Sequence, residues 1–229
     1  MTSPEPAPQR LVRRKEEVPK FAAALAVLGG TAYVASRGVP GWEEQVFEVL
    51  NRQPGALEPV LWAPMQLGSL FGPVVVSGGS WLAWRRRPGW WRPSAGSLVV
   101  GLVAWQLAKV VKAAVERGRP GDVLDEIVRR SGTPADGLGF VSGHTAVAFA
   151  LAAVLSPYLG RRGRWAAYGL AALVGFARIH VGAHLPLDTV GGAALGVTLA
   201  LVWHLAVGIP DDAPVFAHRP AGDPPESSR

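Results

Sequence analysis

Long apolar stretches alternate with short polar or basic stretches along this chain of 229 residues. Several of the apolar stretches come near the ~20 residues that a helix needs to cross a bilayer. The pattern predicts spanning helices at residues 21–36, 58–84, 95–115, 141–158, 165–178 and 185–208. We therefore expect an all-α integral membrane bundle of about six transmembrane helices.

A shorter pattern with helical spacing follows the first expected span, at residues 42–51. Its apolar positions fall on one side and its acidic positions on the other: Trp42, Val46, Phe47 and Leu50 against Glu43, Glu44 and Glu48. Such a pattern is typical of a short helix that lies in the membrane interface. An ordinary amphipathic loop helix is the alternative.

Both ends of the chain are polar. Residues 1–17 and 210–229 are rich in proline, serine and charge, so they cannot bury enough apolar surface to become ordered. We expect two disordered cytoplasmic tails around a transmembrane domain at 18–209. The first apolar run follows a basic stretch but lacks a small-residue cleavage site, which indicates an uncleaved span.

Composition narrows the class of protein further. Hydrophobic residues make up 49% of the chain and its mean hydropathy is +0.21, which is high for a soluble protein. The absence of cysteine excludes disulfides, thiol catalysis and cysteine-based zinc sites. The net charge is +6, but the basic residues lie between apolar runs and form no single aromatic-interleaved surface. We therefore expect the bilayer as a partner, and no nucleic acid.

The most informative polar stretch, residues 178–188, lies between the last two expected spans. Pro186 suits the first turn of a helix, and Asp188 lies four residues after His184, on the same helix face. A carboxylate there can hold one imidazole nitrogen while the other points outward as a base or nucleophile. Arg178 can bring a fixed positive charge to the same place, so the group suits a phosphate.

Two upstream blocks strengthen this interpretation. Residues 112–120 read Lys-x6-Arg-Pro, residues 141–144 read Val-Ser-Gly-His, and residues 178–188 read Arg-x5-His-x3-Asp. The three blocks together resemble the type 2 phosphatidic acid phosphatase superfamily, over roughly residues 109–208. Val141 stands where the family usually has proline and Ala177 where it usually has serine, but neither change removes a group that does chemistry.

The resemblance implies a site of eight residues and a metal-independent mechanism without a cofactor. It implies that His184 attacks phosphorus, that Asp188 orients His184, and that His144 protonates the leaving oxygen. The phosphate-binding residues would be Lys112, Arg119, Ser142, Gly143 and Arg178. Ser142 also suits a helix start, which leaves the N–H groups of Gly143 and His144 free to bind an anion.

Other polar residues near these blocks have plainer interpretations. We expect Lys109 to reach the headgroups and His204 to hydrogen-bond a neighbouring helix. His180 is expected to orient the loop before His184, and a role in the site is the alternative. Glu116 and Arg117 are expected to form a solvated pair or loop contacts.

The distribution of arginine sets the expected orientation. Clusters at residues 85–87 and 161–164 and the basic N-terminal tail fall on one side of a six-span bundle. The positive-inside rule places that side in the cytoplasm, so all three blocks face outward.

The function expected from these observations is hydrolysis of a lipid phosphate or diphosphate through a phosphohistidine. An outward site favours a polyprenyl diphosphate, although the sequence leaves the lipid, the number of phosphates and the oligomeric state open. The alternatives are a vanadium haloperoxidase-like enzyme, and a lipid-phosphate-binding or transport bundle without turnover.

Overall fold

The computed structural model describes residues 11–12, 15–87, 89–134 and 136–210, and these form an almost entirely helical molecule. Its α-helices are α1 (Glu17–Ala35), α2 (Gly41–Asn51), α3 (Glu58–Leu67), α4 (Phe71–Trp84), α5 (Trp91–Val115), α6 (Pro120–Val123), α7 (Gly143–Leu155), α8 (Arg161–His180) and α9 (Pro186–Val207). Short 3-10 helices cover Gly55–Leu57 and Ser156–Tyr158. The all-α fold class is confirmed.

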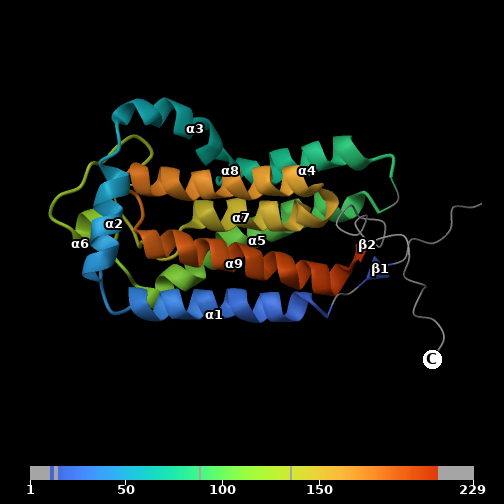
Figure 1. Ribbon diagram of the computed structural model, residues 1–229, viewed down its shortest axis with the longest axis horizontal. Helices are drawn as coiled ribbons and strands as arrows, with labels where there is room; N and C mark the ends of the chain where they lie inside the picture. The colour runs from blue at the N-terminus through green and yellow to red at the C-terminus, as the bar shows by residue number, and fades with distance from the viewer. Residues whose placement is uncertain (1–10, 13–14, 88, 135, 211–229) are drawn as a thin grey trace, which may run out of the picture.

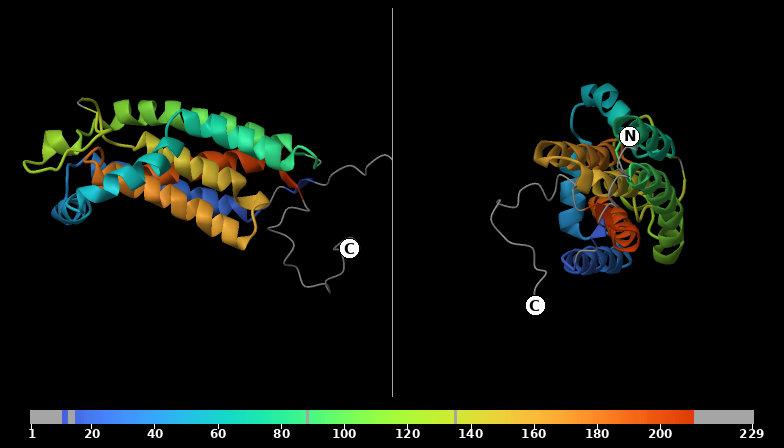
Figure 2. Two further views of the ribbon diagram at one scale, coloured as in Figure 1. Left: turned by 90° about the horizontal axis from the view of Figure 1, so that it is seen from above. Right: turned by 90° about the vertical axis from the view of Figure 1, so that its right-hand side faces the viewer.

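The long helices pack lengthwise into one bundle with α7 at its centre (Figures 1 and 2). Helix α7 contacts α5, α8 and α9, and α1 packs on the other side of α9. Nine of the 13 residues of α7 are buried, which fits a helix that is apolar on all sides. Figure 1 places α2 and α6 at one end of the bundle and the strands β1 and β2 at the other.

Glycines on α9 allow the closest helix contact in this core. A Cβ on Gly192 would lie 2.5 Å from the carbonyl oxygen of Ser142, and one on Gly196 would lie 2.2 Å from that of Ala146. No side chain fits at either position, so α9 rests on the backbone of α7. Small residues at a helix contact allow two backbones to approach this closely.

Within the part of the chain that the structure describes, three helices are long and apolar enough to cross a membrane alone: α1, α9, and the stretch that begins with α5. A fourth candidate is the pair α3 and α4, whose axes bend by 68°. The six expected segments are all helical, but α7 has only 13 residues and α8 begins with an arginine cluster. Length and composition therefore support three to four spans.

The bend between α3 and α4 divides the segment that was expected as one span at 58–84. Pro64 lies inside α3, and the chain then breaks at residues 68–70. A Cβ on Gly68 would lie 2.6 Å from the carbonyl oxygen of His144, so the break passes directly over the start of α7. The bend thus leads the chain past the predicted site.

Helix α2 lies where the amphipathic helix was expected, but the expected division into an apolar side and an acidic side was partly wrong. Glu43 and Phe47 are fully buried, whereas Trp42 and Val46 are exposed. Glu43 points inward because a buried guanidinium, that of Arg117, pairs with it there. The expected acidic face therefore consists of Glu44 and Glu48 without Glu43.

The chain ends are described only in part. β1 (Leu11–Val12) pairs antiparallel with β2 (Ile209–Pro210), which joins the segment before α1 to the segment after α9. The predictions of disordered tails at 1–10, 13–14 and 211–229 lie outside the described residues.

Candidate active site

The three sequence blocks meet at one end of the bundle, at the starts of α7 and α9. The N–H of Ser142 donates to the carbonyl oxygen of Asp188 at 2.8 Å, which ties the second block to the third. Arg119 Nη1 donates to the carbonyl oxygen of Ala183 at 2.9 Å, which ties the first block to the third. Residues far apart in the sequence therefore line one site.

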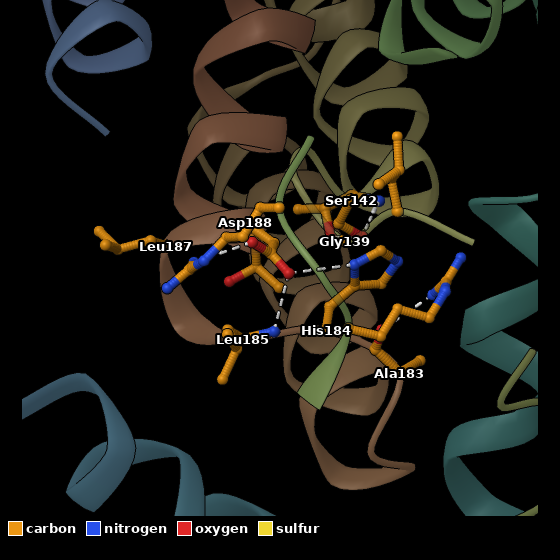
Figure 3. Close-up of polar contacts among 12 residues, drawn as sticks. Gly139, Ser142, Ala183, His184, Leu185, Leu187 and Asp188 are labelled. Carbon is orange, nitrogen blue, oxygen red and sulfur yellow. Dashed lines mark hydrogen bonds and ion pairs between the residues drawn. The ribbon is translucent and has the colours of Figure 1, made fainter. Parts of the chain in front are cut away.

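His184 and Asp188 contact each other as their spacing predicts (Figure 3). His184 Nδ1 lies 3.4 Å from Asp188 Oδ2, and the same oxygen accepts the N–H of Leu185 at 2.9 Å. Pro186 opens α9, so Asp188 lies in its first turn, where a carboxylate is favoured. Both side chains are buried, so their relative orientation is fixed by packing.

His184 lies in the turn between α8 and α9, and its surroundings favour the neutral ring. Burial lowers the pKa of His184 well below its ordinary value, and the charges of Lys112, Arg178 and Arg119 lower it further. With Asp188 against Nδ1, the proton belongs on Nδ1. Nε2 then keeps a lone pair, which is what a nucleophilic imidazole requires.

The three predicted cations, Lys112, Arg119 and Arg178, act electrostatically on both His144 and His184. All three also donate to main-chain oxygens of the loop that precedes α7. The bonds run from Lys112 Nζ to Leu138 (2.7 Å) and Gly139 (2.6 Å), from Arg119 Nε to Asp136 (3.2 Å), and from Arg178 Nη1 to Gly132 (3.1 Å). The loop therefore holds the cations in place around the two histidines.

The start of α7 has the expected N-cap. Ser142 Oγ accepts the N–H of Thr145 at 3.4 Å and the hydroxyl of Thr145 at 2.9 Å. Gly143 and His144 are the first residues of the helix, so their N–H groups have no preceding turn to bind. The half-buried ring of His144 stands edge-on to Trp105, with 5.5 Å between ring centroids.

A model of the PAP2 superfamily matches residues 94–209, which is 116 of the 229 residues. The chain belongs to the PAP2 superfamily. It is a multi-pass membrane protein and a PAP2-type membrane lipid phosphate phosphatase. All three sequence blocks lie inside the matched range.

Two solved structures share the fold of this PAP2 protein. One is LpxE of Aquifex aeolicus, with 23% identity, a TM-score of 0.56, and coverage of 69% of this chain and 92% of that chain. The other is a transmembrane PAP2-type phosphatidylglycerolphosphate phosphatase of Bacillus subtilis, with 21% identity, a TM-score of 0.59, and coverage of 83% and 94%. A comparison with curated proteins found no match.

Sequence reasoning missed the contacts of two charged residues, Arg117 within the first block and Glu43 in α2. Arg117 is buried and pairs with Asp188 and Glu43, so the expected solvated pair with Glu116 was wrong. Glu116 adopts a left-handed conformation with φ 54°, which ends α5 and turns Arg117 into the protein. The one available signal was that Arg117 lies two residues before Arg119 of the first block.

The two departures from the family pattern are both accommodated in the core. Val141 is fully buried and lies against the position of Gly191, while Ala177 is fully buried beside Leu61 and Met65 of α3.

The remaining predictions concern residues outside the eight-residue site. His204 Nε2 lies 3.3 Å from the carbonyl oxygen of Val154, so the predicted bond to a neighbouring helix is confirmed. The ring of His180 stacks on Phe176, and its carbonyl oxygen accepts from Asn51 at 3.0 Å. Lys109 is exposed on α5.

Proposed function

We propose that this PAP2 phosphatase cleaves a lipid phosphate or diphosphate in two steps, through a phosphohistidine on His184. The observation that supports this most strongly is the contact between Asp188 Oδ2 and His184 Nδ1 in a buried turn surrounded by three cations. In the first step His184 Nε2 forms a bond to phosphorus while the P–O bond to the leaving group breaks, which is the ester bond of a monophosphate or the anhydride bond of a diphosphate. Asp188 stabilises the imidazolium that results.

The phosphate would bind to Lys112, Arg119 and Arg178 and to the start of α7. Phosphoryl transfer spreads negative charge over the equatorial oxygens, so fixed cations and N–H donors lower its barrier. Ser142 caps α7 and leaves the N–H of Gly143 aligned with the positive end of the helix dipole. Phosphate oxygens would compete with the loop carbonyls that now accept from the cations.

His144 would serve both steps as the proton carrier. It gives its proton to the leaving oxygen in the first step, and the negative charge of a bound phosphate favours its protonated form. In the second step His144 takes a proton from water, whose oxygen attacks phosphorus while the bond to His184 breaks. No step requires a metal or another cofactor, so activity should survive EDTA.

An apolar groove supports a lipid as the rest of the substrate. A cavity of about 100 Å³ between α4, α7 and α8 has an almost wholly apolar lining that includes Leu67, Leu151 and Val174. Leu67 immediately precedes Gly68, which packs on the backbone of His144. A hydrocarbon chain in this groove would bring its phosphate to the start of α7.

The site is proposed to face outward, with both tails and the arginine clusters in the cytoplasm. This orientation follows from the positive-inside bias and can be tested on the natural cysteine-free chain. Exposed Ser131 and Arg162 lie in the loop before α7 and at the opposite end. An impermeant thiol reagent on intact cells should label Ser131→Cys and not Arg162→Cys. The reverse pattern would overturn the orientation.

An outward site favours a polyprenyl diphosphate among the lipid phosphates. The decisive assay measures release of inorganic phosphate from polyprenyl diphosphate, polyprenyl phosphate, phosphatidate and phosphatidylglycerophosphate by the detergent-purified protein. We expect release from at least one lipid, inhibition by vanadate and no halide oxidation. Halide oxidation with vanadate would favour the haloperoxidase alternative, and lipid binding without phosphate release would favour the non-catalytic bundle.

A further inference from the structure

A continuous chain of buried polar contacts, two of them ion pairs, extends from His184 to α2. Arg117 Nη1 donates to Asp188 Oδ1 at 3.0 Å, which leaves the other carboxylate oxygen, Oδ2, to face His184. Glu43 grips the same guanidinium with both oxygens, at 3.1 Å and 2.5 Å. Both carboxylate oxygens of Asp188 therefore have partners, and Glu43 in turn holds Arg117 in place.

The side chains of this chain of contacts are buried. The side chains of Arg117, Glu43 and Asp188 are 2%, 0% and 0% exposed. Charges buried in this way persist only when they are paired and hydrogen-bonded. Besides its ion pairs, Arg117 Nη2 donates to the carbonyl oxygen of Gly38 at 3.1 Å.

Glu43 also contacts the first turn of α9 directly. Its Oε1 accepts the N–H of Leu187 at 2.8 Å, next to Asp188 in the sequence. Glu43 thus fixes both the main chain beside Asp188 and the cation that Asp188 binds. Glu43 lies outside residues 94–209, which match the PAP2 model, so an element before the matched region completes the surroundings of the site.

We propose that Glu43 and Arg117 are positioning residues for the phosphatase reaction. Arg117 turns the carboxylate of Asp188 toward His184, and Glu43 fixes Arg117 and maintains the charge balance of the group. This inference rests on the proposed nucleophilic role of His184. Neither residue is proposed to touch the phosphate.

Charge bookkeeping explains why two carboxylates surround one guanidinium. The ionised group of Glu43, Arg117 and Asp188 carries one net negative charge. Formation of the phosphohistidine gives His184 a positive charge, which this negative charge offsets at short range. Without the charge of Glu43, Arg117 would neutralise Asp188, and the imidazolium would lose the net negative charge on its Nδ1 side. The expected effect is therefore on kcat and not on KM.

A purely structural ion pair would behave differently. Buried ion pairs often add little to stability, and breaking one mainly leaves an uncompensated charge in the core. Such damage would lower the unfolding temperature, but its effect on kcat would not depend on whether Asp188 is ionised. Dependence on Asp188 is therefore the property to measure.

The first variant is Glu43→Gln, which keeps the shape and an oxygen for the N–H of Leu187 but removes the charge. We expect kcat for a lipid phosphate to fall by about 10–100-fold, by analogy with the loss seen when the partner that orients a metal-ligating histidine is changed. KM should stay nearly unchanged. The matched control is Glu44→Gln, the same change at the exposed neighbouring position of α2, which should alter neither constant.

The deciding experiment combines Glu43→Gln with Asp188→Asn and follows single turnovers of protein that elutes as one folded species. If Glu43 acts through Asp188, adding Glu43→Gln to the Asp188→Asn protein should change the single-turnover rate by less than about twofold. A change of that size lies within the deviation from additivity that is usual for independent sites. An equal fold-loss on both backgrounds would overturn the proposal. So would unchanged kcat in folded Glu43→Gln.

A second variant covers the case in which Glu43→Gln does not fold. Arg117→Lys keeps the charge but cannot bridge two carboxylates with a planar fork, and it should show the same dependence on Asp188. Wild type and His184→Ala are assayed in parallel. An inactive wild type or an active His184→Ala would refute the proposed function as well. Normal behaviour of both, with no coupling between Glu43 or Arg117 and Asp188, would refute only the positioning role.

Discussion

The two ends of the helix bundle treat charge in opposite ways. At the end that holds the three sequence blocks, Glu43, Arg117 and Asp188 are buried and bind one another at hydrogen-bonding distance. At the other end, the arginines of residues 85–87 and most of those at 161–164 are exposed. Exposed charges interact weakly because water screens them, whereas buried charges fix geometry.

Among the described residues of the far end, His204 and Glu17 form a buried ionisable pair that can be compared with the pair at the site. His204 Nδ1 lies 3.9 Å from Glu17 Oε2, and together they join α9 to α1 beside a cavity of about 270 Å³. Around His184, by contrast, a carboxylate and three cations act on one ring. A histidine paired with a carboxylate thus occurs at both ends. At the far end the nearby cations, Lys20 and Arg164, line the cavity, and Lys20 pairs with Glu17 at 2.9 Å.

The largest expected effect comes from removing the proposed nucleophile. His184→Ala should reduce phosphate release to background and prevent any acid-labile phosphoenzyme, because no other group is proposed to bond to phosphorus. His204→Ala at the far end is the matched control and should leave most of the activity. Retained turnover in folded His184→Ala would show that His184 is not the nucleophile.

Removing the proposed proton carrier should cost less. His144→Ala should lower kcat by about 10²–10⁴-fold, the usual contribution of a general acid. The loss should be smaller for a nitrophenyl phosphate, whose leaving group needs no proton. His180→Ala, another histidine at the same end, should be mild. Equal losses for both kinds of substrate would contradict the role of His144 as an acid.

The cations should differ from the exposed arginines even when charge is kept. Arg178→Lys and Arg119→Lys lose the planar fork that grips two oxygens, so each should lower kcat/KM by about tenfold or more. Arg162→Lys at the exposed end should change nothing. The values of kcat/KM are measured from phosphate release at several substrate concentrations. Equal kcat/KM for the three variants would contradict the expected difference between the two ends.

The smallest expected effect is a shift in the pH dependence of kcat/KM. Burial and three cations lower the pKa of His184, so protonation of this ring should reduce kcat/KM only well below pH ~6.5, the ordinary value. Arg119→Met removes one of those cations, which should raise the pKa of His184 and move the acid limb to higher pH. The ionisation of the substrate is titrated separately and divided out. If kcat/KM of Arg119→Met and of wild type fell at the same acidic pH, the proposed effect of Arg119 on the pKa of His184 would be contradicted.

Most of the site was predictable because its residues belong to short local patterns. The i, i+4 spacing of His184 and Asp188, with Pro186 at the helix start, indicated their contact before any tertiary information was used. Ser142 could be recognised as an N-cap for the same reason. Neither Arg117 nor Glu43 could be predicted, because nothing local distinguishes a buried ion pair from a solvated one.

Periodicity, run length and motif spacing determined the all-α class, the positions of the helices and the residues of the three blocks. These properties depend on neighbours within a few residues, which the sequence displays directly. Tertiary structure decided what depends on long-range packing: the 68° bend of α3 and α4, the inward direction of Glu43, and the pairing of Arg117 with Asp188. A charged side chain turns inward only where a partner from a distant segment offsets its loss of hydration, and that partner exists only in the folded chain.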